Sequence, residues 1–132
     1  MSATLERTQR KVIRSFKDLE VYQHGFELAM KSFQATRVFP QDERYGLTTQ
    51  MRNASRSIPA NIAEGWAKRR HELIFKRHLL DAVGSADEMR VWLDVAQSCE
   101  YITGEAHRSL SEAYEVLGRR LYQLIEIWKT FR

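Results

Sequence analysis

The sequence predicts an all-α fold, an antiparallel up-down-up-down four-helix bundle. Apolar residues recur three and four positions apart almost throughout the 132 residues, and no segment of useful length alternates with period two. Short breaks separate four such segments, which favours antiparallel neighbouring helices. With 43% hydrophobic and 29% charged residues, the chain has the composition of one globular domain. Uncharged stretches reach only seven residues, far short of the ~20 that cross a bilayer, so no membrane partner is expected.

The first helix is expected just after Asp18, which can act as its N-cap or as an acid in its first turn. Phe39-Pro40 should close this segment, because proline disfavours the α conformation in the residue before it. Pro40 then suits the first turn of the second helix. The predicted apolar stripe of the first helix is Leu19, Tyr22, Phe26, Ala29 and Phe33.

The second helix carries a proline inside its apolar pattern. Pro59 removes one backbone donor and crowds the carbonyl of Ser55, at a cost of about 3 kcal/mol if nothing compensates. Because the apolar spacing continues past Pro59, we expect one kinked helix rather than two separate helices. Gly65 and the charged run Lys68–Arg70 should mark its end. Its stripe consists of Leu47, Met51, Ala54, Ile58, Ile62 and Trp66.

The third helix should span most of residues 71–98, roughly 40 Å at 1.5 Å per residue, which is typical of a bundle. Small residues at its centre should let a neighbouring backbone approach closely. Thr103 is the expected N-cap of the fourth helix. The small residues are Ala82, Gly84, Ser85 and Ala86.

Three helices carry more apolar residues than one four-helix core requires. Such broad apolar coverage suggests a second buried face, most simply a contact between copies of the chain. The additional residues are Val21, Leu28 and Met30 in the first helix, Leu73, Ile74 and Leu80 in the third, and Tyr114, Ile125 and Ile127 in the fourth.

The residues offer no recognisable catalytic set, so an enzyme, a cofactor and a metal are not expected. No glutamate has a histidine three residues later, the pattern that binds paired metals in helical bundles. His71 and His78 share one helix face, but Lys76 and Arg77 beside them would oppose a cation. Cys99, the one cysteine, is more typical of a packing residue than of a nucleophile, and this cysteine usage favours the reducing cytoplasm.

Charge is arranged in blocks along the chain. Residues 44–78 hold eight basic and two acidic side chains, whereas residues 79–115 hold two basic and eight acidic ones. The segment through Lys17 has five basic residues and one acidic residue, which accounts for the whole net charge of +4. We expect residues 1–17 to form a flexible basic arm and residues 18–132 to form the bundle domain.

The basic block predicts a nucleic-acid-binding surface at the junction of the second and third helices. Such a cluster could neutralise phosphates of RNA or DNA without reading bases. The alternative is a solvated face, or an electrostatic partner for the acidic block of a neighbouring subunit, in a protein with no nucleic-acid role. The residues expected to contact phosphate are Arg52, Arg56, Lys68, Arg69, Arg70, Lys76 and Arg77.

Five short segments carry a family resemblance. In order, they resemble the bacterial four-helix-bundle proteins encoded in 23S rRNA intervening sequences, over roughly residues 16–131. Ile-Pro-Ala-Asn-Ile-Ala-Glu-Gly is the most specific of the matching motifs. The segments are Phe16-Lys-Asp-Leu-Glu-Val-Tyr-Gln23, Arg44-Tyr-Gly-Leu-Thr-Thr-Gln-Met-Arg52, Ser57-Ile-Pro-Ala-Asn-Ile-Ala-Glu-Gly-Trp66, Gly84-Ser85 and Tyr101-Ile102.

The resemblance implies a bundle that assembles as a ring-like homo-oligomer, with a pentamer favoured, and whose biological role is poorly defined. A related branch is the accessory variability determinant of diversity-generating retroelements. That branch is a basic homopentamer that binds nucleic acid and reverse transcriptase. The resemblance therefore implies RNA or DNA as a partner and, by family analogy only, a reverse transcriptase.

The resemblance also implies structural roles around the proline, because the family has a proline where this chain has Pro59. Of the matching positions Asn61, Glu64 and Gly65, Asn61 is expected to hydrogen-bond a backbone group freed by the proline, and Gly65 to permit close packing. The family usually has Leu-Gly before the last turn, where this chain has Cys99-Glu100. The turn is therefore expected to depend on Gly104.

Overall fold

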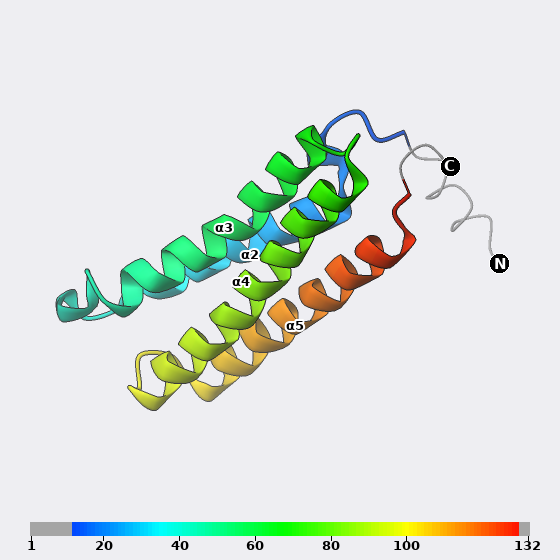
Figure 1. Cartoon of the computed structure of the whole chain (residues 1–132). Helices are drawn as coiled ribbons and strands as arrows, with labels where there is room; N and C mark the ends of the chain where they lie inside the picture. Colours follow the sequence, from blue (N-terminus) through cyan, green and yellow to red (C-terminus); the bar gives the residue numbers. More distant parts are fainter. Residues whose placement is uncertain (1–11, 130–132) are drawn as a thin grey trace.

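The computed structural model describes residues 12–129, and in that part of the chain it contains four α-helices and no strand. The all-α prediction with four helices is confirmed. Figure 1 shows the four helices packed along one another, with short connections at alternate ends of the molecule. The elements are η1 (Phe16–Asp18), α2 (Glu20–Thr36), η2 (Gln41–Glu43), α3 (Leu47–Ala67), α4 (Glu72–Ser98) and α5 (Gly104–Ile127). Residues 1–11 of the predicted arm lie outside the described residues.

Asp18 does not cap α2, contrary to the prediction. Its Oδ2 accepts hydrogen bonds from the backbone N–H groups of Arg14 and Ser15, at 2.8 and 3.1 Å. The Ser15 hydroxyl in turn accepts from the N–H of Lys17 at 3.1 Å. These bonds form a capping box around the short helix η1, so α2 begins after Leu19 without a side-chain cap.

Pro40 was predicted in the first turn of the second long helix, but it precedes η2, and α3 begins only at Leu47. The cap of α3 comes from Glu43, whose Oε1 accepts from the N–H of Leu47 at 3.0 Å. Its Oε2 accepts from the hydroxyl of Tyr101 at 2.9 Å, which ties this connection to the α4–α5 turn. The hydrogen bonds from Leu47 and Tyr101 lower the pKa of Glu43.

The helix α3 passes through Pro59 without interruption, so the prediction of one helix rather than two is confirmed. Pro59 is buried, and it packs toward α2. Opposite it lies Gly25, where an added Cβ would be 3.0 Å from Ile58 and 3.8 Å from Pro59. A glycine on α2 therefore makes room for the proline of α3.

The helices α3 and α4 approach each other closely at Gly65. A Cβ at this position would lie 2.7 Å from the Cβ of His78 and 3.1 Å from Phe75. Farther along the same interface, the Ser57 hydroxyl donates to that of Ser85 at 2.7 Å. Of the small residues predicted to face a neighbour, Ala82 and Ala86 are fully buried, whereas Gly84 faces open space.

The buried face of α2 agrees with the predicted stripe only in part, because Leu19 and Ala29 are buried and Tyr22 packs against the core. Leu28 and Ser32 are buried, whereas Phe26, which was expected in the core, is half exposed. Ser32 can be buried because its hydroxyl lies 2.6 Å from that of Tyr114. The Tyr114 hydroxyl also donates to the carbonyl of Leu28 at 3.1 Å. Burial raises the pKa of Tyr114 to about 12.

The predicted second apolar face is consequently smaller than expected. Val21, Leu28 and Tyr114 belong to the single core, which draws buried residues from all four helices. They were assigned to a second face because the inward side of α2 also carries small and polar residues, so it does not appear in the sequence as an apolar stripe. Exposed apolar residues remain on the other helix surfaces, and they include Met30, Leu73, Ile74, Leu80 and Ile127.

Glu100 ends α4 in the left-handed conformation, with φ at 62°. The N–H of Glu100 donates to the carbonyl of Gln97, and the N–H of Tyr101 to that of Ala96, both at 2.9 Å. This is the hydrogen-bond pattern of a Schellman turn, which usually has glycine at the left-handed position. A glutamate therefore does here what glycine does in most such turns.

Gly104 does not stop a helix, contrary to the prediction, because it is the first residue of α5. Thr103 is the N-cap of α5, as predicted, and its hydroxyl accepts from the N–H of Ala106 at 3.0 Å. The α4–α5 turn thus combines a left-handed glutamate with a threonine cap.

We expect Gly65→Ala to destabilise the bundle by roughly 1–3 kcal/mol, because the added methyl group overlaps the side chain of His78. The matched control is Gly118→Ala on α5, where nothing lies within 4 Å of the added carbon. The control should gain up to about 1 kcal/mol from helix propensity. Urea unfolding followed by circular dichroism measures both variants, and equal stabilities would contradict the close approach at Gly65.

Candidate functional site

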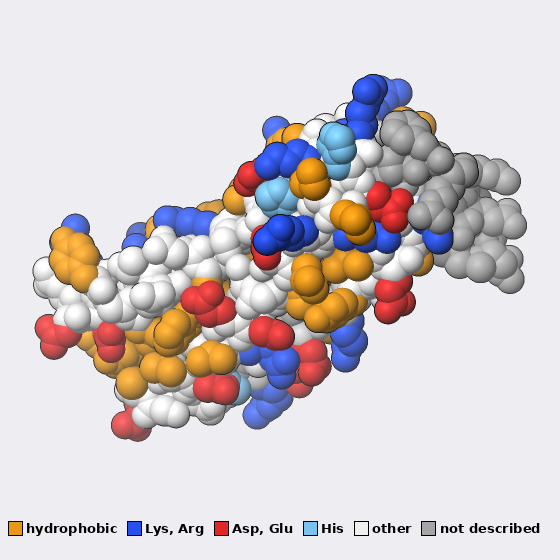
Figure 2. Space-filling view, viewed as in Figure 1, with side chains coloured by type: hydrophobic (Ala, Val, Ile, Leu, Met, Phe, Trp, Pro, Cys, Tyr) orange, Lys and Arg blue, Asp and Glu red, His pale blue; other side chains and the backbone are white. Residues whose placement is uncertain are grey.

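The predicted phosphate-binding residues lie in two groups rather than one cluster. Arg52 and Arg56 lie one turn apart on α3, while the other five surround the α3–α4 connection. Twelve residues separate Arg56 from Lys68, which is about 18 Å along the axis of α3. In Figure 2, blue basic side chains follow the upper edge of the molecule, and most red acidic side chains lie below it.

Three arginines surround the side chain of Phe33. The guanidinium carbons of Arg52, Arg56 and Arg37 lie 4.6, 5.9 and 6.0 Å from the centre of its ring. The Nε of Arg52 also donates to the hydroxyl of Thr36 at 2.9 Å, which orients this guanidinium. We call Arg37, Arg52 and Arg56 the Phe33 arginine cluster.

No carboxylate of the described residues lies within 4 Å of the Phe33 arginine cluster. The π face of Phe33 stabilises the guanidinium groups only in part. Three like charges around one ring repel one another, so an anion that reaches them would lower the free energy. Guanidinium groups also match the geometry of phosphate oxygens, which makes phosphate the natural ligand of such a cluster.

Sequence reasoning missed Arg37 in this cluster. Arg37 is the C-cap residue of α2, and it lies outside the basic block that begins at Arg44. It lies four residues after Phe33, one turn along α2, whereas Arg52 and Arg56 reach the same ring because α3 packs against α2. A second missed residue is Arg44 itself, whose guanidinium carbon lies 5.4 Å from the ring centre of the exposed Tyr45.

Most basic side chains at the α3–α4 connection already have partners within the protein. The guanidinium of Arg69 lies 4.2 Å from the ring centre of Trp66 and donates to its carbonyl at 3.0 Å. Lys68 pairs with Glu64, and Lys76 pairs with Glu72, each at 3.2 Å. Each of these three basic side chains therefore already has a partner within the protein.

Arg70 and Arg77 differ from their neighbours at this connection. Both side chains are exposed, and no carboxylate of residues 12–129 lies within 4 Å of either one. Of the seven predicted phosphate contacts, two pair with carboxylates and Arg69 lies over Trp66. The other four have no carboxylate partner within the described residues. These are Arg52, Arg56, Arg70 and Arg77.

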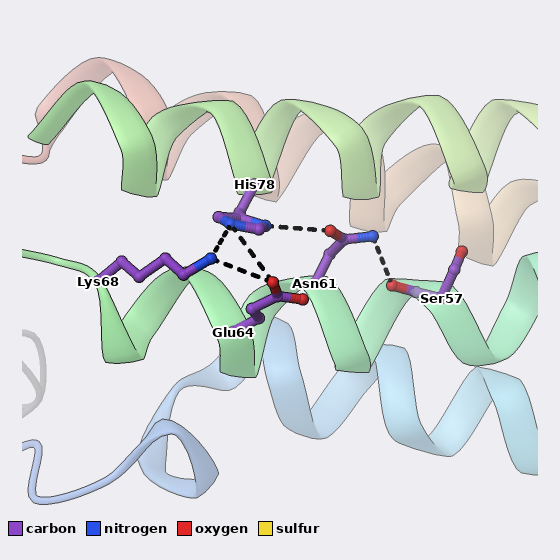
Figure 3. A network of polar contacts seen from close by, with 5 residues as sticks. All are labelled: Ser57, Asn61, Glu64, Lys68 and His78. Atoms are coloured by element: carbon purple, nitrogen blue, oxygen red, sulfur yellow. Dashed lines mark hydrogen bonds and ion pairs between the residues drawn. The ribbon is translucent and has the colours of Figure 1, made fainter. Parts of the chain in front are cut away.

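A polar network joins α3 to α4 beside this connection (Figure 3). The Nδ1 of His78 lies 3.2 Å from the Oδ1 of Asn61. Because that oxygen can only accept, His78 carries a proton on Nδ1. Its Nε2 then faces the ammonium of Lys68 at 3.5 Å, and the carboxylate of Glu64 lies 4.0 Å away.

Asn61 bonds to the backbone, but not to the predicted group. Its Nδ2 donates to the carbonyl of Ser57 at 3.0 Å. The carbonyl that Pro59 deprives of its usual N–H donor is that of Ser55, two residues earlier. Asn61 therefore links α3 to His78 rather than repairing the gap left by the proline.

The described residues contain no group of three His, Cys, Asp or Glu side chains placed to hold a metal ion. His78, which sequence spacing paired with His71 as a remote metal candidate, bonds instead to Asn61. Among the described helices, none has the length and apolar character to traverse a lipid bilayer.

Comparisons with known proteins identify a family. A family model described as 23S rRNA-intervening sequence protein matches residues 17–123. Among solved structures, the chain is similar to a protein of unknown function from the S23 ribosomal protein family of Bacteroides thetaiotaomicron. The TM-score is 0.71 at 26% sequence identity, over 80% of this chain and 98% of that chain. No curated protein matches the sequence.

We expect Arg69→Ala to lower the free energy of unfolding by about 1–2 kcal/mol, because it removes both the contact with Trp66 and a charged hydrogen bond. The neighbouring substitution Arg70→Ala should change stability by less than about 0.5 kcal/mol, since Arg70 lies on the surface. Thermal and urea unfolding compare the two variants. A larger loss for Arg70→Ala would contradict the assignment of Arg69 to the fold.

Proposed function

The chain belongs to the 23S rRNA-intervening sequence protein family, and from this premise we propose that it is a non-enzymatic, homo-oligomeric bundle that binds RNA or DNA. The contacts are to phosphate groups and do not depend on base sequence. The observation that carries this proposal is the Phe33 arginine cluster, where three guanidinium groups converge on one ring. The proposal covers nucleic acid alone, and a reverse transcriptase partner is implied only by the resemblance.

The arrangement of the cluster suits a phosphodiester backbone. Arg52 is already oriented by Thr36 and Phe33, so less side-chain freedom is lost when it binds. The phosphates of a strand that crosses the cluster would pair with arginines that have no carboxylate partner, and this pairing would release counterions. Arg70 and Arg77 extend the basic surface to the far end of α3, whereas Lys68, Arg69 and Lys76 already have partners within the protein.

We also propose an assembly of several copies, with the pentamer of the family resemblance favoured. In this proposal the four helices are antiparallel and α3 is kinked at Pro59, and an exposed apolar row on α4 forms the contact between copies. Leu73 in this row is 81% exposed. At 100° per residue the row is nearly straight, and Gly84 lies within it with open space above. The exposed row consists of Leu73, Leu80, Val91 and Val95.

The same row supports a second candidate function, an interaction bundle with no nucleic-acid role. In that case the basic block of one subunit pairs with the acidic block of its neighbour. For either function we place the protein in the cytoplasm, the compartment that a single cysteine favours.

We expect the double variant Arg52→Gln/Arg56→Gln to bind a structured RNA roughly tenfold or more weakly, because two charged phosphate contacts are lost. For this variant, the slope of the logarithm of affinity against the logarithm of salt concentration should be shallower by about 2. The control, Lys31→Gln/Arg119→Gln, removes the same charge from residues paired with Glu27 and Glu115. Electrophoretic titration at two salt concentrations gives both quantities.

The control variant should bind as the unaltered protein does. Equal weakening of both double variants would show that only net charge matters, and it would contradict the cluster. Failure of the unaltered protein to retard RNA or DNA at low salt would overturn the nucleic-acid proposal and favour the interaction bundle.

We expect Leu73→Gln/Leu80→Gln to shift the protein toward smaller assemblies, because it makes the apolar row of α4 polar. The control is Val12→Gln/Val38→Gln, which alters two exposed apolar residues outside the predicted second face. Sedimentation velocity measures the mass of each variant. A monomeric unaltered protein would contradict assembly, and an unchanged mass in the first variant would contradict this row as the interface.

A further inference from the structure

Tyr45 is the most exposed large hydrophobic side chain of residues 12–129, with 85% of its surface open to solvent. It lies in the connection between η2 and α3. The turn that carries it is held on both sides, because Gly46 donates to the carbonyl of Glu43 at 2.9 Å and the Thr49 hydroxyl donates to the carbonyl of Arg44. The structure thus presents an aromatic ring to water from a constrained turn.

The ring of Tyr45 makes one aromatic or cation–π contact within the described residues, with the guanidinium of Arg44 at 5.4 Å from the ring centre. It takes no part in the core. An exposed tyrosine loses little side-chain entropy on binding, because it has only two rotatable side-chain bonds, and its ring offers a large flat surface. The open face of this ring is therefore suited to a flat partner.

The charge around Tyr45 indicates which partner. Arg44 adjoins the ring. Arg52 of the Phe33 arginine cluster lies on α3, five residues or about 7.5 Å along the helix axis from Leu47, where α3 begins. Of the two acids in this connection, Glu43 turns inward to Leu47 and Tyr101, while Asp42 is exposed. An aromatic ring beside a row of arginines is the arrangement by which proteins hold single-stranded nucleic acid.

We propose, on the basis of the nucleic-acid binding proposed above, that Tyr45 and Arg44 form a stacking platform for an unpaired base, so that the bound nucleic acid is single-stranded. The Phe33 arginine cluster holds the backbone of the same strand. A duplex can satisfy the arginines, but its bases are stacked on one another and leave no open face for Tyr45. The platform therefore adds affinity for single strands only.

The test uses the full-length protein and fluorescein-labelled 15-nucleotide probes, each as an unpaired strand and as a duplex, in RNA and in DNA. Tyr45→Ala should weaken binding of the unpaired strands roughly 5- to 150-fold, the range measured for loss of one stacking contact. Duplex binding should change by less than about twofold, because phosphate contacts are unaffected. Tyr45→Phe is the matched control and should retain single-strand affinity, since stacking needs the ring and not the hydroxyl.

A strand in which every nucleotide is abasic, with the phosphates kept, gives an independent measurement. It should bind the unaltered protein more weakly than the ordinary unpaired strand does, and it should bind Tyr45→Ala as well as it binds the unaltered protein, because no base is left to stack. An equal loss on Tyr45→Ala for the abasic and the ordinary strand would overturn the platform.

The outcomes separate this inference from the nucleic-acid proposal. In one outcome, Arg52→Gln/Arg56→Gln weakens binding, while Tyr45→Ala weakens the binding of unpaired strands and duplexes equally or weakens neither. The platform is then overturned, and the proposal of phosphate binding stands. If the unaltered protein binds no probe, both fail. A change in oligomer mass on Tyr45→Ala would assign the ring to a contact between copies and would also overturn the platform.

Discussion

The close approach of α3 to α4 is the constraint on which the rest of the structure depends. It requires Gly65, because the side chains of His78 and Phe75 occupy the space that a Cβ would need. The approach brings His78 within hydrogen-bonding distance of Asn61. Beside this contact the chain turns from α3 into α4, and there Arg69 lies over the ring of Trp66. Gly65 therefore sets the packing of the two helices, while the partners of Lys68, Arg69 and Lys76 lie three or four residues away in the chain.

The helix α3 serves two different surfaces because of its geometry. Asn61 follows Arg52 by nine residues, and at 100° per residue these two side chains lie on opposite sides of the helix. The side of Asn61 faces α4 and carries a satisfied polar network. The side of Arg52 adjoins α2, where Phe33 and Thr36 orient the arginine. The candidate site can therefore change without disturbing the contact with α4.

Sequence patterns predicted the structure correctly where one turn of chain contains the whole interaction, as at the N-cap Thr103. They failed at Asp18, which is the last residue of the 3-10 helix η1, and at Pro40, which the 3-10 helix η2 separates from α3. Glu100 could not be foreseen, since its left-handed conformation is unusual for a residue with a side chain. The inward side of α2 was missed because Ser32 is polar, and only its bond to Tyr114, 82 residues away, permits its burial.

The sequence by itself determined the four helices and the segregation of basic and acidic blocks, because helical periodicity and charge order are properties of neighbouring residues. Only the tertiary structure decided which of those charges are open. Arg69 and Arg70 are adjacent in the chain, yet only Arg69 stacks on Trp66. Arg37 lies outside the basic block and joins Arg52 over Phe33. Arg37 lies one turn from Phe33 on α2, but Arg52 and Arg56 reach that ring only because α3 packs on α2, and the spacing within one helix does not encode that packing.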